Sequence, residues 1–164
     1  MENNLIYGEI TFQGALDLIN NLKENNEINE DSIFVDIGSG YGKLPIIFSE
    51  LCDISSIGIE IVKEKHDIAL KTKWTNKKRI VTYINNDFNN CKAIIDVCNI
   101  IYVDCLVWDK ALLEKLKNIL PKNALLIHNS HTFLREIKHE VLKLNVSWKD
   151  ELSKFYKLNT NDIR

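Results

Sequence analysis

Short apolar segments alternate with helical segments along most of this chain, and this alternation constrains the fold more than any other feature. The apolar segments predict strands at residues 33–37, 56–60, 79–84, 99–103 and 124–128. Their nearly continuous apolar character is typical of parallel strands that are buried on both faces. Helices are predicted between them at residues 42–52, 62–73 and 110–120. Strands and helices in this order form a doubly wound α/β sheet.

Two further regions flank this alternating core. Residues 11–22 predict an amphipathic helix whose apolar face carries Phe12, Ala15, Leu16, Ile19 and Leu22. A short helix is predicted at 132–138, and two alternating segments at 140–148 and 152–158, joined by a turn at 149–151, indicate an antiparallel hairpin at the sheet edge. We therefore expect a single domain with a Rossmann-like, mostly parallel sheet of about seven strands. Its parts are an N-terminal motif and helix (1–32), a core (33–128), and a C-terminal helix and hairpin (129–164).

The composition is that of an ordinary globular protein, with 164 residues, 45% of them hydrophobic, and a net charge of −2. A chain of this length can bury a sufficient core, so disulfide scaffolds and disordered chains are excluded. No apolar run approaches the roughly 20 residues that span a bilayer, and the N-terminus lacks the features of a signal peptide. Heavy use of Asn, Lys and Ile indicates an AT-rich genome, viral or other. We expect a soluble intracellular monomer with four free thiols: Cys52, Cys91, Cys98 and Cys105.

Two groups of titratable side chains have open interpretations. His128 and His131 lie three residues apart, but no Asp, Glu or Cys stands at ligand spacing beside them, so we expect no metal site. Basic residues predominate between 63 and 79, as either a solvated helix face or a docking patch for DNA or another acidic surface. That patch would consist of Lys71, Lys73, Lys77, Lys78 and Arg79.

A glycine-rich segment after the first predicted strand carries the clearest chemical signal. In Asp36-Ile37-Gly38-Ser39-Gly40-Tyr41-Gly42, three glycines alternate on a strand-to-helix turn. Glycine permits a tight reversal there and lets a ligand approach backbone N–H groups. The spacing differs from the dinucleotide fingerprint, in which two residues separate the last two glycines. With an acid at the end of the strand, the segment resembles the first motif of S-adenosylmethionine-dependent methyltransferases.

Such enzymes carry two further acids at defined places. One closes the second strand and accepts hydrogen bonds from the ribose hydroxyls, and Glu60 ends Ile57-Gly58-Ile59-Glu60 at the expected distance. The other follows the third strand and accepts from the adenine amine beside an apolar ring, and Asn86-Asp87-Phe88 supplies both. The three features together indicate S-adenosyl-L-methionine as cofactor.

A more specific resemblance covers residues 6–158. It is carried by Ile6-Tyr7-Gly8-Glu9-Ile10-Thr11-Phe12, by the segment from Phe34 to Gly40 with Gly42, by Gly58-Ile59-Glu60 and by Val146-Ser147-Trp148. Together they resemble the disruptor-of-telomeric-silencing (DOT-like) family, the histone lysine methyltransferases that lack a SET domain. The Tyr7-Gly8-Glu9 motif is the specific part, because glycine-rich loops are shared by all the relatives. The resemblance implies a histone-lysine N-methyltransferase that acts on chromatin in a nucleus, with a nucleosome or histone as its partner.

The resemblance also implies roles for individual residues. Tyr7, Glu9 and Thr11 would close the methionine end of the cofactor, and its amino-acid part and sugar would be lined by Asp36, Gly38, Ser39, Gly40 and Gly42. Glu60 would hold the ribose, and Asp87 with Phe88 the adenine. Trp148 and the pair Phe155-Tyr156 would form the walls of a narrow channel for the target lysine. A core position is equally open for Trp148, and which member of the pair faces the channel is also open.

The chain departs from the family after the fourth predicted strand. The family carries two asparagines and an aromatic residue there, whereas this chain has Val103-Asp104-Cys105-Leu106. The attacking amine must be neutral, although a free lysine has a pKa near 10.4. Asp104 could contact the cofactor, hydrogen-bond the incoming amine or accept its proton, but a carboxylate also favours protonated lysine. The family's N-terminal helical region is absent too, so we expect any nucleosome contact to come from the catalytic domain.

Three alternatives stay open beside the histone reading. A methyltransferase of the same fold acting on a non-histone protein lysine would be indifferent to nucleosomes. A cofactor-binding but catalytically degenerate interaction module would bind the cofactor without turnover. A nucleic-acid methyltransferase ranks lower, because the fourth strand lacks the Asn-Pro-Pro-aromatic signature of base-amine enzymes.

Overall fold

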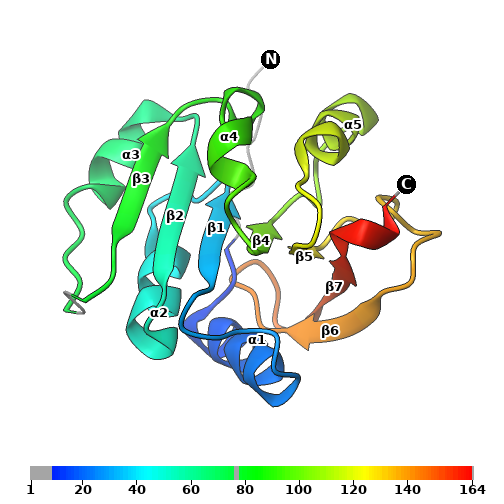
Figure 1. Ribbon diagram of the computed structural model, residues 1–164, viewed down its shortest axis with the longest axis horizontal. Coiled ribbons are helices and arrows are strands. Elements are labelled where there is room, and N and C mark those ends of the chain that lie inside the picture. Colours follow the sequence, from blue (N-terminus) through cyan, green and yellow to red (C-terminus); the bar gives the residue numbers. More distant parts are fainter. Residues whose placement is uncertain (1–8, 76–77, 164) are drawn as a thin grey trace.

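The computed structural model of the chain describes residues 9–75 and 78–163, which contain a seven-stranded sheet of order β3-β2-β1-β4-β5-β7-β6 (Figure 1). The strands are β1 (Ile33–Ile37), β2 (Ser55–Glu60), β3 (Val81–Asn85), β4 (Ile100–Val103), β5 (Leu125–His128), β6 (Glu140–Leu144) and β7 (Ser153–Asn159). Each of β1 to β5 runs parallel to its neighbours within that group, and β7 pairs antiparallel with both β5 and β6. The predicted doubly wound sheet with a C-terminal antiparallel hairpin is confirmed.

Helices pack on both faces of this sheet. They are α1 (Phe12–Glu24), α2 (Lys43–Cys52), α3 (Lys63–Ala69), α4 (Lys92–Ile95) and α5 (Lys110–Ile119), with 3₁₀ turns η1 (Phe88–Asn90) and η2 (Thr160–Asp162). Alternate residues of a strand point to opposite faces. In β4, Ile100 and Tyr102 belong to the apolar cluster that includes residues of α1 and α2, whereas Ile101 and Val103 belong to the cluster that includes α5. The central strands are therefore buried on both faces, as their apolar sequences predict.

The acidic residues identified in the sequence lie together where the parallel strands end, which we call the carboxyl edge of the sheet. The arrows of β1, β2 and β3 point toward the same edge in Figure 1, and the parallel pairing extends this direction to β4. The glycine-rich turn follows β1, Glu60 ends β2, Asp87 lies shortly after β3, and Asp104 follows β4. Ligands of doubly wound sheets bind at this carboxyl edge, where the strand order reverses.

The N-terminal segment reaches the same edge because it pairs with the connection between β6 and β7. Ile10 forms an antiparallel bridge with Val146, and Thr11 N donates to Asn145 O at 3.1 Å. Thr11 also caps α1, since its Oγ1 accepts from Gly14 N at 3.1 Å. A Cβ at Gly14 would lie 2.3 Å from Asn145 O, so only glycine permits this approach of α1 to the connection. The contact fixes the position of Glu9 and Thr11.

Several local predictions are wrong. The helix expected at 62–73 ends at Ala69, because Lys71 N and Thr72 N donate to Ile68 O and Ala69 O, three residues back, and so form turns in place of helical hydrogen bonds. The helix expected at 132–138 is a series of turns, because Leu134 has φ 54°, which an α-helix cannot contain. The hairpin arm expected to reach residue 148 ends at Leu144, and Phe12 on the expected apolar face of α1 is 59% exposed.

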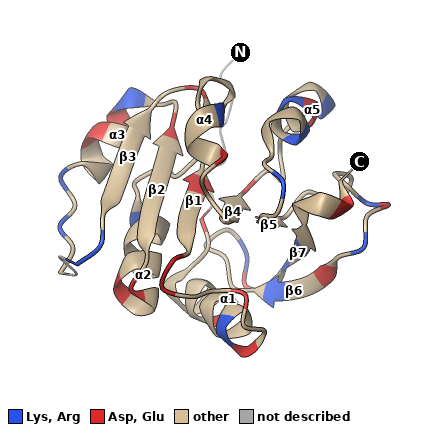
Figure 2. Ribbon diagram, viewed as in Figure 1, with Lys and Arg blue, Asp and Glu red and all other residues tan. Residues whose placement is uncertain are grey.

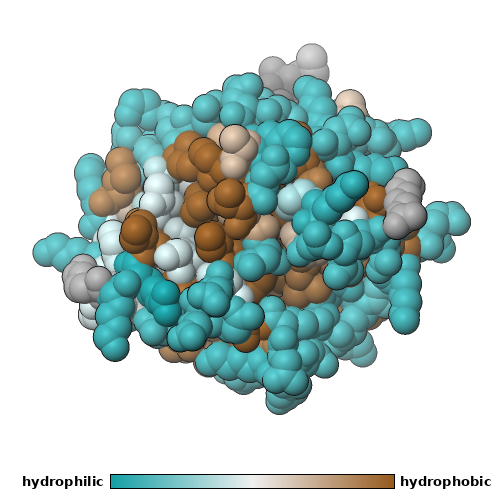
Figure 3. Space-filling view, in the orientation of Figure 1, coloured by the Kyte–Doolittle hydropathy of each residue, from teal (hydrophilic) through white to brown (hydrophobic). Residues whose placement is uncertain are grey.

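The short α4, which the sequence pattern did not predict, leaves part of one sheet face uncovered. Ile57 of β2 and Ile84 of β3 are only partly buried on the face that bears the α5 cluster. Figure 3 shows apolar side chains at the surface over β2 and α4.

In the part of the chain that the structure describes, no helix is both long and apolar enough to cross a membrane.

Candidate active site

The glycine-rich turn between β1 and α2 depends on backbone conformations that favour glycine. Gly38, Gly40 and Gly42 have φ values of 84°, 54° and 77°. The turn is fastened to β2, because the N–H groups of Gly38 and Ser39 both donate to Ile59 O, at 2.8 and 3.0 Å. Apart from Gly38 itself and its two chain neighbours, none of the described residues has an atom within 4 Å of the place where a Cβ of Gly38 would stand. The turn therefore leaves open space beside its first glycine, where a ligand can approach the backbone.

Glu60 holds this turn from the end of β2. Its side chain is buried, and Oε2 accepts from Gly40 N at 2.7 Å while Oε1 accepts from Val62 N at 2.8 Å. Each carboxylate oxygen has about two acceptor sites, so one on each oxygen remains for a further donor. Glu60 can thus fix the turn and accept from ligand hydroxyls at the same time.

A cavity of about 620 Å³ lies between Gly38, Glu60 and η1. Asp87 and Phe88 line it, together with Trp108, whose ring stacks on that of Phe88 with centroids 5.3 Å apart. Asp87 caps η1 through Oδ1, which accepts from Asn89 N at 2.9 Å and from Asn89 Nδ2 at 2.7 Å. The cavity combines an acid for hydroxyl groups with flat apolar walls, which suits a nucleoside.

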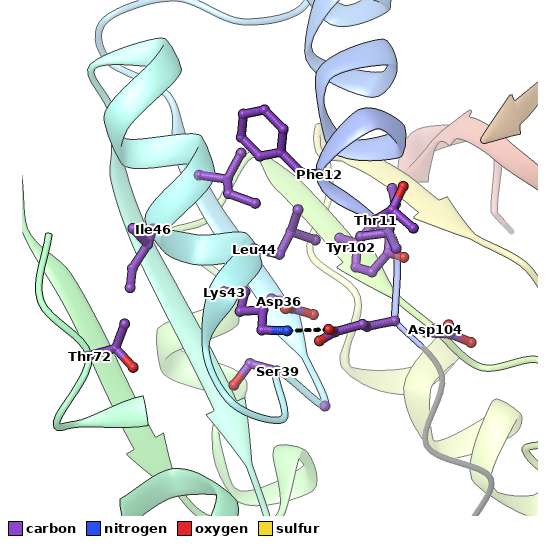
Figure 4. A pocket seen from close by; sticks show the side chains of 14 residues that line it. Thr11, Phe12, Asp36, Ser39, Lys43, Leu44, Ile46, Thr72, Tyr102 and Asp104 are labelled. Carbon is purple, nitrogen blue, oxygen red and sulfur yellow. Dashed lines mark hydrogen bonds and ion pairs between the residues drawn. The ribbon is translucent and has the colours of Figure 1, made fainter. Parts of the chain in front are cut away.

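A second cavity of about 380 Å³ adjoins the first, because Gly38 lines both. Figure 4 shows Thr11, Asp36, Ser39, Tyr102 and Asp104 around this second cavity, with apolar side chains of α1 and α2 on its other side. Glu9 lines it as well and forms an ion pair with Lys43, which is the dashed line in Figure 4. We call this the acidic cavity, because its lining includes Glu9, Asp36 and Asp104.

Burial changes the proton affinity of two of these acids. Burial raises the pKa of Asp36 well above its usual range, and the nearby carboxylates of Asp104, Glu60 and Glu9 raise it further. Burial also raises the pKa of Asp104, against the smaller opposing effect of a hydrogen bond from Asn129. A cation in the acidic cavity would stabilise the ionised form of both acids.

Asn129 sets the orientation of Asp104. Its Oδ1 accepts from Cys105 N at 2.8 Å, and its Nδ2 donates to Asp104 Oδ1 at 2.6 Å. Asp104 Oδ2, the Tyr102 hydroxyl and Ser39 Oγ are buried, and no hydrogen-bond partner for them occurs among the described residues. Buried polar atoms are normally paired, so these three atoms of the acidic cavity are candidates for bonds to a ligand.

The aromatic residues expected to form a lysine channel are not brought to this cavity. Phe155 is fully buried, and its ring packs on Tyr102 with centroids 5.8 Å apart, so the prediction that it forms a channel wall is wrong. Tyr156 points to the opposite face of the sheet and lines a different cavity beside β5. Trp148 is half-buried against the apolar cluster of α1 and α2, which is the core position left open for it.

Two residues with predicted roles lie outside the described residues: Tyr7, expected at the cofactor, and Lys77, expected in the basic patch. The rest of the basic segment lies in the connection from α3 to β3, which enters β3 at its amino end (Figure 2). Lys71, Lys73 and Lys78 are exposed there, and Arg79 Nε lies 3.7 Å from Asp53 Oδ1. Arg79 thus lies near the amino end of β3, whereas Lys71 and Lys73 flank Thr72, which lines the acidic cavity.

Three residues of the site were not identified from the sequence. Trp108 lies in a loop after β4 with no motif, and Asn129 gains its role only through contact with Asp104. Tyr102 lies inside a predicted strand, and only the alternation of β4 directs its hydroxyl toward the acidic cavity.

The residues at this edge fit S-adenosylmethionine. The larger cavity offers Glu60 for ribose hydroxyls and Asp87 and Phe88 for a purine. The acidic cavity, reached past Gly38, offers unpartnered polar atoms and carboxylates beside the place where a sulfonium cation would lie. Positive charge at that point is favoured by the acids.

Comparison with known proteins points the same way. The model of the family "Histone methylation protein DOT1" matches residues 2–125. An RNA methyltransferase from Salinibacter ruber, solved with S-adenosyl-L-homocysteine, superposes with a TM-score of 0.60 at 13% identity over 87% of this chain and 90% of its own. A putative caffeoyl-CoA O-methyltransferase from Staphylococcus aureus gives a TM-score of 0.61 at 18% identity over 92% and 86%. MtNAS, solved with MTA and tNA, gives 0.66 at 12% identity over 89% and 60%. At these identities the structures establish the shared fold.

Proposed function

Because this chain belongs to the DOT1 family of histone methylation proteins, we propose that it transfers a methyl group from S-adenosylmethionine to the side-chain amine of a protein lysine. The enzyme class, an S-adenosylmethionine-dependent methyltransferase, follows from the family and agrees with the fold. The observation that carries the lysine acceptor is the acidic cavity, which adjoins the larger cavity at Gly38.

Charge selects the acceptor at this cavity. Glu9 is already paired with Lys43, so the acids left for a cationic side chain are Asp36 and Asp104, whose ionised forms a bound cation would stabilise. The long apolar stem of lysine would pack against the apolar side chains of α1 and α2 that complete the lining.

The amine must lose a proton before it can attack. Burial raises the pKa of Asp104, and burial in the same cavity would lower that of a lysine ammonium, so the two values approach each other and proton transfer becomes easier. Asp104 Oδ2 is the unpartnered oxygen, and Asn129 keeps the carboxylate oriented through Oδ1. We assign Asp104 as the residue that hydrogen-bonds the amine and accepts its proton.

The other residues bind and orient. When bound, S-adenosylmethionine supplies an electrophilic methyl group activated by its positive sulfur. Glu60 and the glycine-rich turn fix the nucleoside end, while Tyr102 and Ser39 offer their unpartnered hydroxyl groups in the acidic cavity. Holding donor and acceptor in line supplies much of the rate acceleration.

Within this function, a core-histone lysine on the nucleosome is the acceptor that the family favours. The exposed lysines between α3 and β3 would contact nucleosomal DNA or an acidic surface, and the enzyme would then act where nucleosomes occur, as a monomer. The second candidate is a lysine of a non-histone protein. It is favoured by Asp104, which replaces the amide that the family carries after this strand.

A radiolabelled methyl-transfer assay distinguishes these acceptors. Reconstituted nucleosomes, free core histones, an unrelated protein and nucleic acid are offered side by side, and mass spectrometry identifies the labelled residue. Wild type is compared with Asp104→Asn and with Asp150→Asn, which removes an exposed carboxylate elsewhere.

We expect a labelled lysine on the nucleosome, a rate that falls at least tenfold in Asp104→Asn, and an unchanged rate in Asp150→Asn. Label only on free protein would move the proposal to the non-histone acceptor. Label only on nucleic acid, or none despite cofactor binding, would contradict it.

A further inference from the structure

A separate cavity of about 420 Å³ lies beside β5 and β7, on the sheet face opposite to the acidic cavity. Its lining includes His128, Ser130, His131, Arg135, His139 and Tyr156. Apart from the expectation for Tyr156, none of these residues has a role in the methyl transfer described above. We call it the histidine cavity.

His128 is the residue that points to a ligand here. Only 1% of its surface is exposed, and neither ring nitrogen has a hydrogen-bond partner among the residues that the structure describes. Its ring lies edge-on to Phe133 and tilted against Tyr156, with centroids 5.3 and 5.4 Å apart. Burial lowers the pKa of His128 to about 4, so near neutral pH the ring is uncharged and carries one N–H donor. A buried donor without an acceptor is costly and is normally satisfied.

The remaining polar groups of the cavity add further donors. Ser130 Oγ accepts from Phe133 N at 3.3 Å and lies 3.5 Å from Thr132 Oγ1, where either hydroxyl can donate, so the Ser130 O–H can turn from Thr132 to a ligand. The Tyr156 hydroxyl and His131 Nδ1 form a hydrogen bond of 2.9 Å at the rim. Arg135 is exposed and brings a guanidinium group to the lining.

The charge of this cavity is opposite to that of the acidic cavity. No Asp or Glu is found among the described residues that line it, whereas the guanidinium group of Arg135 supplies a positive charge. A metal ion does not explain the histidines, because no three ligand side chains within residues 9–75 and 78–163 are arranged to hold one. Donors around a positively charged rim suit an oxyanion.

One short segment, residues 128–130, contacts both cavities. Asn129 donates to Asp104 in the acidic cavity, and the residues on either side of it, His128 and Ser130, line the histidine cavity. The cavities lie on opposite faces, but Asp104 follows β4 and His128 ends the neighbouring β5, so both reach the carboxyl ends of these strands. An acceptor lying across that end of the sheet could place its amine at Asp104 and a second group in the histidine cavity.

We propose that the histidine cavity binds an oxyanion, a carboxylate or phosphate carried by the methyl acceptor near its target lysine. The link to the acceptor rests on the proposed function, whereas binding of the oxyanion does not. Phosphate and carboxylate share the chemistry that the donors recognise. Lysine peptides with and without an acidic residue show whether the oxyanion belongs to the methyl acceptor or is a free ion.

Binding is tested with inorganic phosphate, followed by the imidazole signals of the histidines in NMR spectra of the full chain. Phosphate should shift the signals of His128. Arg135→Ala and Ser130→Ala should each weaken binding about tenfold, the effect of removing a charge-assisted hydrogen bond. Lys138→Ala is the matched control, because it removes an exposed positive charge nearby that does not line the cavity, and it should change affinity less than about twofold. His128→Phe should abolish binding, and the exposed Arg135 keeps the test valid if that variant fails to fold.

Absence of a phosphate-dependent shift, or equal weakening in Lys138→Ala and Arg135→Ala, would overturn the proposal whether or not the enzyme methylates lysine. The second arm compares lysine peptides that carry glutamate, phosphoserine or glutamine two residues from the lysine. The acidic peptides should have a KM about tenfold lower than the glutamine peptide, and Arg135→Ala should remove the difference. Phosphate binding with equal KM values would show a site for a free ion and overturn the assignment to the acceptor.

Discussion

Replacing Glu60 by glutamine should lower the free energy of unfolding of the ligand-free protein, because Glu60 anchors the glycine-rich turn. Glu60 accepts from two backbone N–H groups, at Gly40 and Val62, one on each carboxylate oxygen. Glutamine retains one acceptor oxygen, so in either orientation its NH₂ group faces one of these N–H donors. One hydrogen bond to a charged group is lost and a donor is left unpaired, which should cost about 2–3 kcal/mol.

For a chain of 164 residues this loss corresponds to a decrease in Tm of roughly 4–12 °C. Urea unfolding followed by circular dichroism measures the free energy of unfolding directly. Glu30→Gln is the matched control, since that side chain is exposed and its replacement should change stability by less than about 0.5 kcal/mol. Equal stability of the two variants would refute the assignment of Glu60 as the anchor of the glycine-rich turn.

Three other predictions follow from the same geometry. Gly14→Ala should destabilise the fold by about 1–3 kcal/mol, because the added Cβ would collide with Asn145 O, and this cost exceeds the helix preference of alanine. Thermal unfolding measures the effect, and a raised Tm would contradict it. Gly40→Arg should abolish binding of S-adenosyl-L-homocysteine in calorimetry, since Gly40 is buried with φ 54° and its N–H donates to Glu60. Undiminished binding would show that the cofactor does not bind beside the glycine-rich turn. Burial raises the pKa of Asp36 on folding, so the folded state binds more protons than the unfolded chain above about pH 4 and stability falls as pH rises toward the folded pKa. Asp36→Asn removes this term, so its stability relative to wild type should increase between about pH 4 and pH 7, and urea unfolding that gives the same slope for both would disprove it.

The parts of the site that a strand end determines could be predicted from the sequence. Asp36, Glu60 and Asp87 stand at or just after parallel strands, and parallel pairing brings such positions to one edge whatever the details of packing. Glycines at positive φ also have a local signature. For these residues, sequence order determines position in space.

The positions of Phe155 and Tyr156 could not be predicted from the sequence, because they depend on strand register. Phe155 and Tyr156 are neighbours in β7 and therefore point to opposite faces, so a shift of one residue exchanges them. Pairing of Tyr156 with His128 directs it to the histidine cavity and directs Phe155 into the core beside Tyr102. Nothing local in the sequence determines that pairing.

Contacts between distant segments account for the other differences. Asn129 orients Asp104 from 25 positions away, and Leu134 adopts a left-handed conformation that ends an otherwise plausible helix. The bridge between Ile10 and Val146 likewise ends the first arm of the hairpin early. These contacts also place Glu9 and Thr11 at the acidic cavity, so they shape the site as well as the fold.

A crystal structure of the chain with S-adenosyl-L-homocysteine would test the central claim most directly. The account predicts ribose hydroxyls on Glu60, adenine between Asp87 and the Phe88–Trp108 ring pair, and the sulfur facing the acidic cavity near Asp104. A ligand bound elsewhere, or a sulfur directed away from Asp104, would contradict the assignment of these two cavities to a methyl donor and its acceptor.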